Sequence, residues 1–200
     1  MIKFLPEIII SICVISYGII TIVGIQRGTV KPVLASRIFF LLALFLSALT
    51  DFRQTGVHGL LSNTFNLVDT LSSFAIVLFT LFHKDTRKKF TKFEKICLGA
   101  VIFIFLGWII SKENILAHLS VQVILVIAYL PTLIHLWKSS QNTESLGAWS
   151  LDLFASLLSI IEPLRTMDLL PLVYGIRSII STFAVIILIL RIKFRKIKAV

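Results

Sequence analysis

SSFAIV at residues 72–77 and STFAVI at residues 181–186 are two versions of one short sequence, 109 positions apart. Each occurs near the end of a hydrophobic stretch, and each stretch runs into a basic segment. Duplicated membrane units are a known way to build a transporter, because two similar halves can enclose one path and move against each other. The repeat therefore predicts a membrane protein with two related halves.

The composition of the 200 residues agrees with this prediction. The chain is 57% hydrophobic with a mean hydropathy of +0.97, which is more apolar surface than a water-soluble domain of this size can bury. The apolar residues form long runs typical of membrane helices, too long and too continuous for barrel strands. The net charge is +10, but the basic residues flank the apolar runs, so no nucleic-acid partner is expected.

Seven apolar runs are predicted to cross the bilayer as helices. They cover Glu7–Ile25, Val33–Thr50, Leu60–Phe82, Ile96–Ile110, Leu116–Trp137, Leu146–Ile161 and Leu169–Leu190. Several are shorter than the roughly 20 residues of a perpendicular span, so flanking residues are expected to contribute. Lys3 and the first run resemble a signal peptide, but no small-x-small cleavage pattern follows, so the run is expected to remain as the first span.

The basic residues predict the orientation of these spans. Fifteen of the 20 Lys and Arg residues fall on one side of the seven-span layout and four on the other. Because positively charged loops stay in the cytoplasm, the N-terminus is expected outside and the C-terminus inside. Arg37 counts among the fifteen as an anchoring charge, and Trp149 is expected near the cytoplasmic interface as an anchor.

The fourth run has no strongly polar residue, which predicts a connector that faces lipid on most sides. Two three-span units are parallel only if one extra crossing separates them. The predicted fold is thus an all-α polytopic membrane protein whose seven transmembrane helices form two parallel three-helix repeats joined by a linker helix (3+1+3). Its predicted segments are 1–83 (first repeat), 84–114 (basic cytoplasmic loop and linker helix), 115–192 (second repeat) and 193–200 (basic cytoplasmic tail).

The third and seventh runs each carry a polar stripe on one helical face. The stripes comprise Ser62, Asn63, Asn66, Asp69, Thr70 and Ser73, and Tyr174, Arg177, Ser178, Ser181 and Thr182. In the register of the repeat, Asp69 corresponds to Ser178, so Asp69 and Arg177 are expected at nearly the same depth. Either these two form a buried ion pair that locks the helices, or the stripes line a cavity for a polar solute. The candidate substrate-binding residues are Asn63, Asn66, Asp69, Tyr174 and Arg177.

Pro131 and Asp152 are the candidates for a hinge or gate. Pro131 interrupts the fifth run, where it removes a backbone donor and is expected to kink the helix. Asp152 lies near the cytoplasmic end of the sixth run; it either gates the path or couples it to protons, or pairs with Arg37 or Lys138. No catalytic or metal-ligand pattern is found, so no enzyme activity, metal or cofactor is expected.

Three segments of the second half resemble a known family. AYLPTL at 128–133, WKSS at 137–140 and TESLGAWSL at 143–151 resemble the PQ-loop signature, in which Leu-Pro-Gln at a helix kink leads through a short cytoplasmic loop to a small-residue turn. The 3+1+3 plan is similar to the SWEET-type sugar facilitators and their PQ-loop relatives, and the chain also resembles uncharacterised bacterial membrane proteins. Thr132 stands where the PQ-loop proteins have Gln, and the first half has no Leu-Pro-Gln.

The resemblance implies a pocket between the two repeats, and together with the polar stripes it predicts a membrane carrier. The expected cargo is a small polar metabolite such as a sugar, an amino acid or a vitamin-like solute, moved by alternating access, either passively or coupled to an ion. The alternative is a non-transporting seven-helix sensor or membrane assembly partner, in which the stripes only hold helices together. The expected partners are the lipid bilayer and the solute, with a homo-oligomer left open, and the expected location is the bacterial cytoplasmic (inner) membrane.

Overall fold

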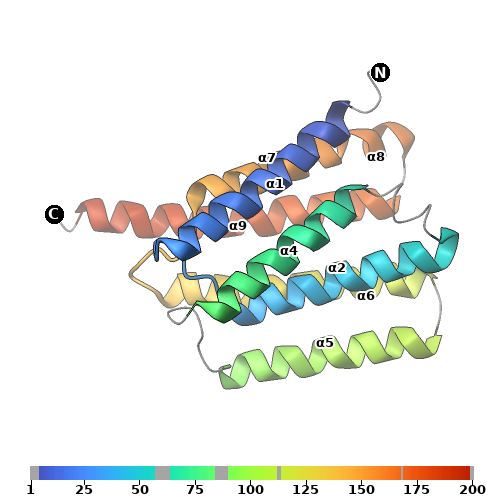
Figure 1. Cartoon of the computed structure of the whole chain (residues 1–200), viewed down its shortest axis with the longest axis horizontal. Helices are drawn as coiled ribbons and strands as arrows, with labels where there is room; N and C mark the ends of the chain where they lie inside the picture. Colours follow the sequence, from blue (N-terminus) through green and yellow to red (C-terminus); the bar gives the residue numbers. More distant parts are fainter. Residues whose placement is uncertain (1–4, 57–63, 84–89, 112–113, 168, 199–200) are drawn as a thin grey trace.

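A computed structural model describes residues 5–56, 64–83, 90–111, 114–167 and 169–198, and these parts of the chain are helical, without strands. The helices are α1 (Leu5–Gln26), α2 (Leu34–Thr55), α4 (Thr64–Phe82), α5 (Lys92–Ser111), α6 (Asn114–Lys138), α7 (Leu146–Ser159), α8 (Ile161–Thr166) and α9 (Leu169–Lys198). Figure 1 shows that the long helices lie side by side in an elongated bundle.

Among the described residues, five helical segments are long and apolar enough to cross a membrane, judged by length and composition. They are Pro6–Gln26, Lys92–Ile110, Leu119–Lys138, Leu146–Thr166 and Leu172–Arg195. Large apolar side chains also lie on the outside of the bundle, and on α5 Phe103 is 79% exposed and Ile110 81%. Exposed apolar surface on this scale requires lipid or another apolar partner. The chain therefore has the character of a helical integral membrane protein.

The seven predicted runs all fall on helices, although the structure alters some of their ends. The third run was predicted from Leu60, and residues 60–63 lie outside the described part of the chain; α4 begins at Thr64. The sixth run covers α7 and reaches α8. The apolar parts of α2 and α4 are shorter than those of the other spans, at Leu34–Leu49 and Leu67–Phe82. Their crossing of the membrane, and the orientation of the chain, remain predictions.

Local sequence signals explain several helix ends. Gly28, two residues past α1, has a φ of +67°, a left-handed conformation that glycine adopts without strain. At the start of α5, the Glu94 carboxylate accepts from the Thr91 N–H at 2.7 Å, and the Thr91 hydroxyl accepts from the Glu94 N–H at 3.2 Å. This reciprocal pair is a capping box. The Ser145 hydroxyl likewise caps α7 by accepting from the Ala148 N–H at 3.2 Å.

The helices group into two sets of three, here named the first trio (α1, α2, α4) and the second trio (α6, α7, α9). In the first trio α4 packs against both α1 and α2, which do not contact each other within the described residues. In the second trio α9 packs in the same way against α6 and α7. Residues 72–77 lie in α4 and residues 181–186 in α9, so the repeated sequence occupies the middle helix of each trio.

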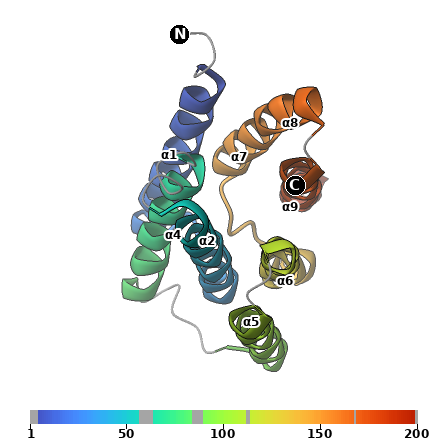
Figure 2. The same cartoon turned by 90° about the vertical axis from the view of Figure 1, so that its right-hand side faces the viewer.

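Within the described part of the chain, two helix pairs join the trios to each other. α1 packs against α7, and α2 packs against α6, while α5 packs on α6 and α2 at the edge of the bundle. Viewed from its end in Figure 2, the bundle has the first trio on one side, α7, α9 and α6 on the other, and α5 beyond α6. Side chains that face inward from both trios therefore meet along the boundary between them.

Candidate functional site

A cavity lies between the two trios and is lined by side chains from all six of their helices. Its volume is about 50 Å³, which is room for a few water molecules. The polar residues of its wall are Tyr17, Arg37, Asp69, Ser73, Tyr129, Asp152, Ser156, Ser159, Tyr174, Arg177 and Ser178. Such a concentration of polar groups inside an apolar bundle marks this cavity as the candidate functional site.

The predicted site residues fall in three groups. Asp69, Tyr174, Arg177 and Asp152 all line the cavity, so the structure brings together residues from α4, α7 and α9. Asn63 lies outside the described residues, and of Asn66 only its place in α4 is described. Pro131 does not line this cavity; it borders a wider one, of about 700 Å³, together with residues at the starts of α2 and α5.

The guanidinium of Arg177 has protein partners for only part of its donor groups. Its Nε donates to Gln122 Oε1 on α6 at 2.8 Å, and its guanidinium carbon lies 4.8 Å from the centre of the Tyr174 ring. Its Nη1 is buried without a hydrogen-bond partner in the described structure. The ion pair with Asp69 that would have locked α4 to α9 is not formed. Arg177 therefore keeps unused capacity to bind an anion.

The two acids of the cavity differ in their partners. Asp152 Oδ2 accepts from the Thr182 hydroxyl at 2.9 Å, and that hydroxyl lies 3.2 Å from the Tyr129 hydroxyl. The Asp69 carboxylate makes no hydrogen bond or ion pair with the described part of the chain. The expected alternative, in which Asp152 pairs with Arg37 or Lys138, is not found among the described residues, where Arg37 has a different carboxylate as its partner.

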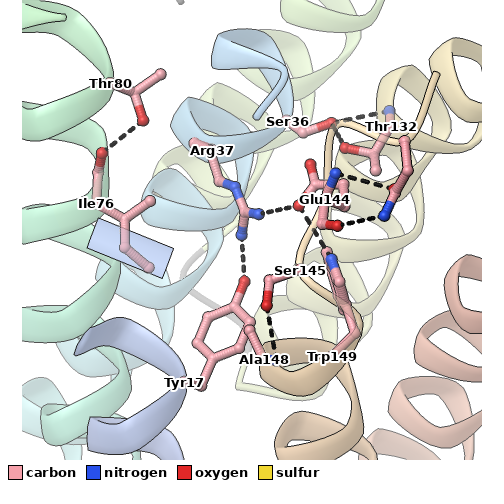
Figure 3. Close-up of polar contacts among 11 residues, drawn as sticks. Tyr17, Ser36, Arg37, Ile76, Thr80, Thr132, Glu144, Ser145, Ala148 and Trp149 are labelled. Atoms are coloured by element: carbon pink, nitrogen blue, oxygen red, sulfur yellow. Dashed lines mark hydrogen bonds and ion pairs between the residues drawn. The ribbon is translucent and has the colours of Figure 1, made fainter. Parts of the chain in front are cut away.

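That partner is Glu144, in a buried cluster at one end of the cavity (Figure 3). Arg37 Nη2 lies 3.0 Å from Glu144 Oε2, and Arg37 Nη1 donates to the Tyr17 hydroxyl. The same Glu144 oxygen accepts from Trp149 Nε1 at 3.0 Å. Arg37 is 5% exposed and Glu144 4%. Arg37 and Trp149 are therefore buried between the trios and do not reach a lipid interface as exposed anchors; their depth in the membrane stays a prediction.

The backbone around Glu144 is fixed by its own turn. Asn142 Nδ2 donates to the Glu144 carbonyl at 2.8 Å, and Asn142 Oδ1 accepts from the Glu144 N–H at 3.1 Å. The next contact reaches the first trio, because the Lys31 N–H donates to the Thr143 carbonyl at 2.8 Å. The segment between α1 and α2 is thus bonded directly to the segment between α6 and α7.

Pro131 lies within α6 beside a second polar contact between the trios. The N–H of Thr132 donates to Ser36 Oγ on α2 at 3.1 Å, and the Thr132 hydroxyl donates to the same oxygen at 2.9 Å. Thr132 is 2% exposed and Ser36 0%. Ser36 and Arg37 are neighbours on α2, so this contact and the Arg37 cluster hold the same end of the trios together.

The sequence pattern missed Arg37, Glu144 and Trp149 as members of the site. The available signals were a charge four residues into an apolar run and the Glu and Trp of the TESLGAWSL segment, 143–151. Comparison of the chain with models of known families, with curated proteins and with solved structures finds no match. The resemblance to SWEET and PQ-loop proteins therefore rests on the sequence features alone.

Proposed function

We propose that this chain is a membrane carrier for a small polar solute, which passes by alternating access through the cavity between the first and second trios. The observation that carries the proposal is the cavity wall. All six helices of the trios contribute to it. It contains Arg177, whose Nη1 has no hydrogen-bond partner in the described structure, and Asp69, which has no described partner. Buried charges of this kind are costly and usually serve a solute or ion path.

The pattern of helix contacts supports a 3+1+3 layout with parallel repeats. If α1, α2 and α4 are equated with α6, α7 and α9, the contact of α1 with α7 becomes the contact of α6 with α2, and both occur. An exchange of this kind is what two-fold related repeats produce. In this proposal α5 is the linker, the N-terminus is outside, and the segments that join α1 to α2 and α6 to α7 face the cytoplasm.

The Arg37–Glu144 cluster supports a closed state at the proposed cytoplasmic end. Arg37 belongs to the first trio and Glu144 directly precedes α7 of the second, so their ion pair bridges the two units. At about 50 Å³ the cavity is well below the ~300 Å³ of a typical ligand pocket. Passage of a solute therefore requires the trios to separate at this end, with loss of the buried pair.

The alternative is a sensor or assembly partner in which the polar stripes pack dry against each other. If the stripes only held helices together, their polar groups would be satisfied by one another. Arg177 Nη1, however, has no partner in the described structure, and the Asp69 carboxylate has no described partner. We therefore favour the carrier.

Cysteine accessibility tests alternating access without knowledge of the solute. In a background with Cys13→Ala and Cys97→Ala, Ser73→Cys places a thiol in the cavity wall. A membrane-impermeant maleimide is added to right-side-out and to inside-out vesicles in turn. A carrier exposes its site to each side alternately, so labelling is expected from both.

Leu71→Cys is the matched control, because Leu71 lies two residues away on α4 and is exposed on its outer face. A thiol there faces lipid and is expected to react from neither side. Ser140→Cys, in the exposed segment between α6 and α7, is expected to react only from the cytoplasmic side. Labelling of Ser73→Cys from one side only, or from neither, would contradict the carrier.

A further inference from the structure

We propose that the cavity binds a zwitterion, an amino-acid-class solute whose carboxylate pairs with Arg177 and whose ammonium group pairs with Asp69 and Asp152. The inference deepens the proposed function and rests on it. It follows from which hydrogen-bonding groups of the cavity wall are already used by the protein and which are left.

Most polar groups of the wall are satisfied within the protein. Tyr17 accepts from Arg37, the hydroxyls of Ser156 and Ser178 lie 2.8 Å apart, and Tyr129 and Asp152 share Thr182. The hydroxyl groups that would orient a neutral sugar are thus largely engaged with one another. A neutral solute would also leave the charges of the wall unpaired.

The remaining capacity is charged and of both signs. Arg177 has its Nη1 without a partner, and Asp69 has no described partner. A guanidinium pairs best with a carboxylate or phosphate, and carboxylates pair with an ammonium group. Arg177 and Asp152 belong to the second trio and Asp69 to the first, so a zwitterion would bridge the two units while it neutralises both kinds of charge.

The sum of the charges restricts the solute further. Arg37 and Glu144 neutralise each other, which leaves two carboxyl groups, Asp69 and Asp152, beside one guanidinium, that of Arg177. A free inorganic anion or an acidic amino acid brings extra negative charge against two carboxylates. Neutral and cationic amino acids are therefore accepted, and acidic amino acids and sugars are rejected.

Uptake into proteoliposomes of the full chain tests this assignment with four labelled probes: alanine, lysine, glutamate and glucose. Alanine, lysine or both are expected to accumulate, and glutamate and glucose are not. Arg177→Gln and Asp69→Asn should each lower that uptake about 10- to 100-fold, because a charged hydrogen bond to the solute is lost. Arg177→Lys keeps the charge, so it should retain more uptake than Arg177→Gln.

Arg195→Gln on α9 and Glu7→Gln on α1 are the matched controls, because both side chains are exposed away from the cavity; their uptake should equal that of the parent. Ser73→Cys labelling in each cavity variant reports whether it is still folded and open to both sides. Uptake of glucose or glutamate alone, or of none of the probes, overturns the zwitterion assignment. The carrier itself is overturned only by the labelling experiment, so the two failures are distinguishable.

Discussion

Arg37 is a full positive charge buried between two helix trios of an apolar bundle. Removal of a guanidinium from water costs several kcal/mol, which its partners must offset. Glu144 supplies the opposite charge, and Tyr17 and the face of the Trp149 ring, 5.4 Å from the guanidinium carbon, cover the rest. Arg37 Nε and Glu144 Oε1 nevertheless have no partner in the described structure. The cluster therefore holds the trios together without making their separation prohibitive.

Glu144→Ala is expected to destabilise the folded protein by about 3–5 kcal/mol, because it leaves Arg37 buried and unpaired. Glu144→Gln should cost less, since an amide oxygen can still accept from Arg37 and from the Trp149 indole. The measurement is the midpoint of unfolding in detergent, compared with the parent.

The matched control for this prediction is Glu7→Gln, because Glu7 is exposed near the start of α1. It should leave the unfolding midpoint unchanged. Equal midpoints for Glu144→Ala and the parent would mean that the ion pair adds nothing to the stability of this state.

The sequence does not reveal which side chains of the site contact each other. Helical periodicity placed Asp69 and Arg177 on inward faces, and both line the cavity. Periodicity cannot tell whether two inward-facing charges touch, because that depends on how far the trios stand apart. The charge count groups Arg37 with the anchoring charges of one side, and only its packing against Glu144, 107 positions away, reveals its burial.

At the scale of elements, α6 is attached to α2 at the turn that contains Pro131. Ser36 Oγ accepts both from the Thr132 N–H and from the Thr132 hydroxyl. Both residues are buried, so no water replaces these bonds if the oxygen is removed. The pair ties a proline-containing helix of one trio to the first turn of a helix in the other.

Ser36→Ala is expected to destabilise the fold by about 1–3 kcal/mol, because two buried donors of Thr132 lose their acceptor. The size of the effect is read from unfolding in detergent. Ser150→Ala on α7 is the matched control, since Ser150 is exposed, and it should shift the midpoint little. A Ser36→Ala protein as stable as the control would show that the Thr132 groups find other acceptors.

Pro131→Ala tests the hinge assignment separately from stability. Alanine restores a backbone donor within α6 and should stiffen the helix, so the fold is retained while exchange between inward and outward states slows. The rate of Ser73→Cys labelling from the cytoplasmic side should fall several-fold. An unchanged labelling rate would place the hinge elsewhere.

Helices were more predictable than their partners because each needs only local information. Long apolar runs located every described long helix, and Thr91 with Glu94 shows how a four-residue signal fixes a start. The packing order, with α4 between α1 and α2, depends on contacts between helices, and a single apolar run does not predict these contacts. The repeated segments at 72–77 and 181–186 were the one clue to it, since they mark the two middle helices.

At the scale of the whole molecule, the contacts at one end decide whether the trios can move apart. The Lys31 N–H donates to the Thr143 carbonyl, next to the Arg37–Glu144 pair, so the segment after α1 and the segment before α7 lie against each other. In the proposed transport cycle this contact must open each time the cavity faces the cytoplasm. A covalent bond placed there should arrest the cycle with that end closed.

Lys31→Cys combined with Thr143→Cys provides such a bond in the background without Cys13 and Cys97. The protein is oxidised first, and the thiol of Ser73→Cys is labelled afterwards. Labelling from the cytoplasmic side is expected to be abolished, while labelling from the outside stays intact. Addition of a reductant should then restore access from the cytoplasmic side. Each single variant, oxidised in the same way, is the control and should label from both sides. If the oxidised pair still admits the reagent from the cytoplasm, the path between the trios does not run past Lys31 and Thr143, and the Arg37–Glu144 pair is a structural contact away from it.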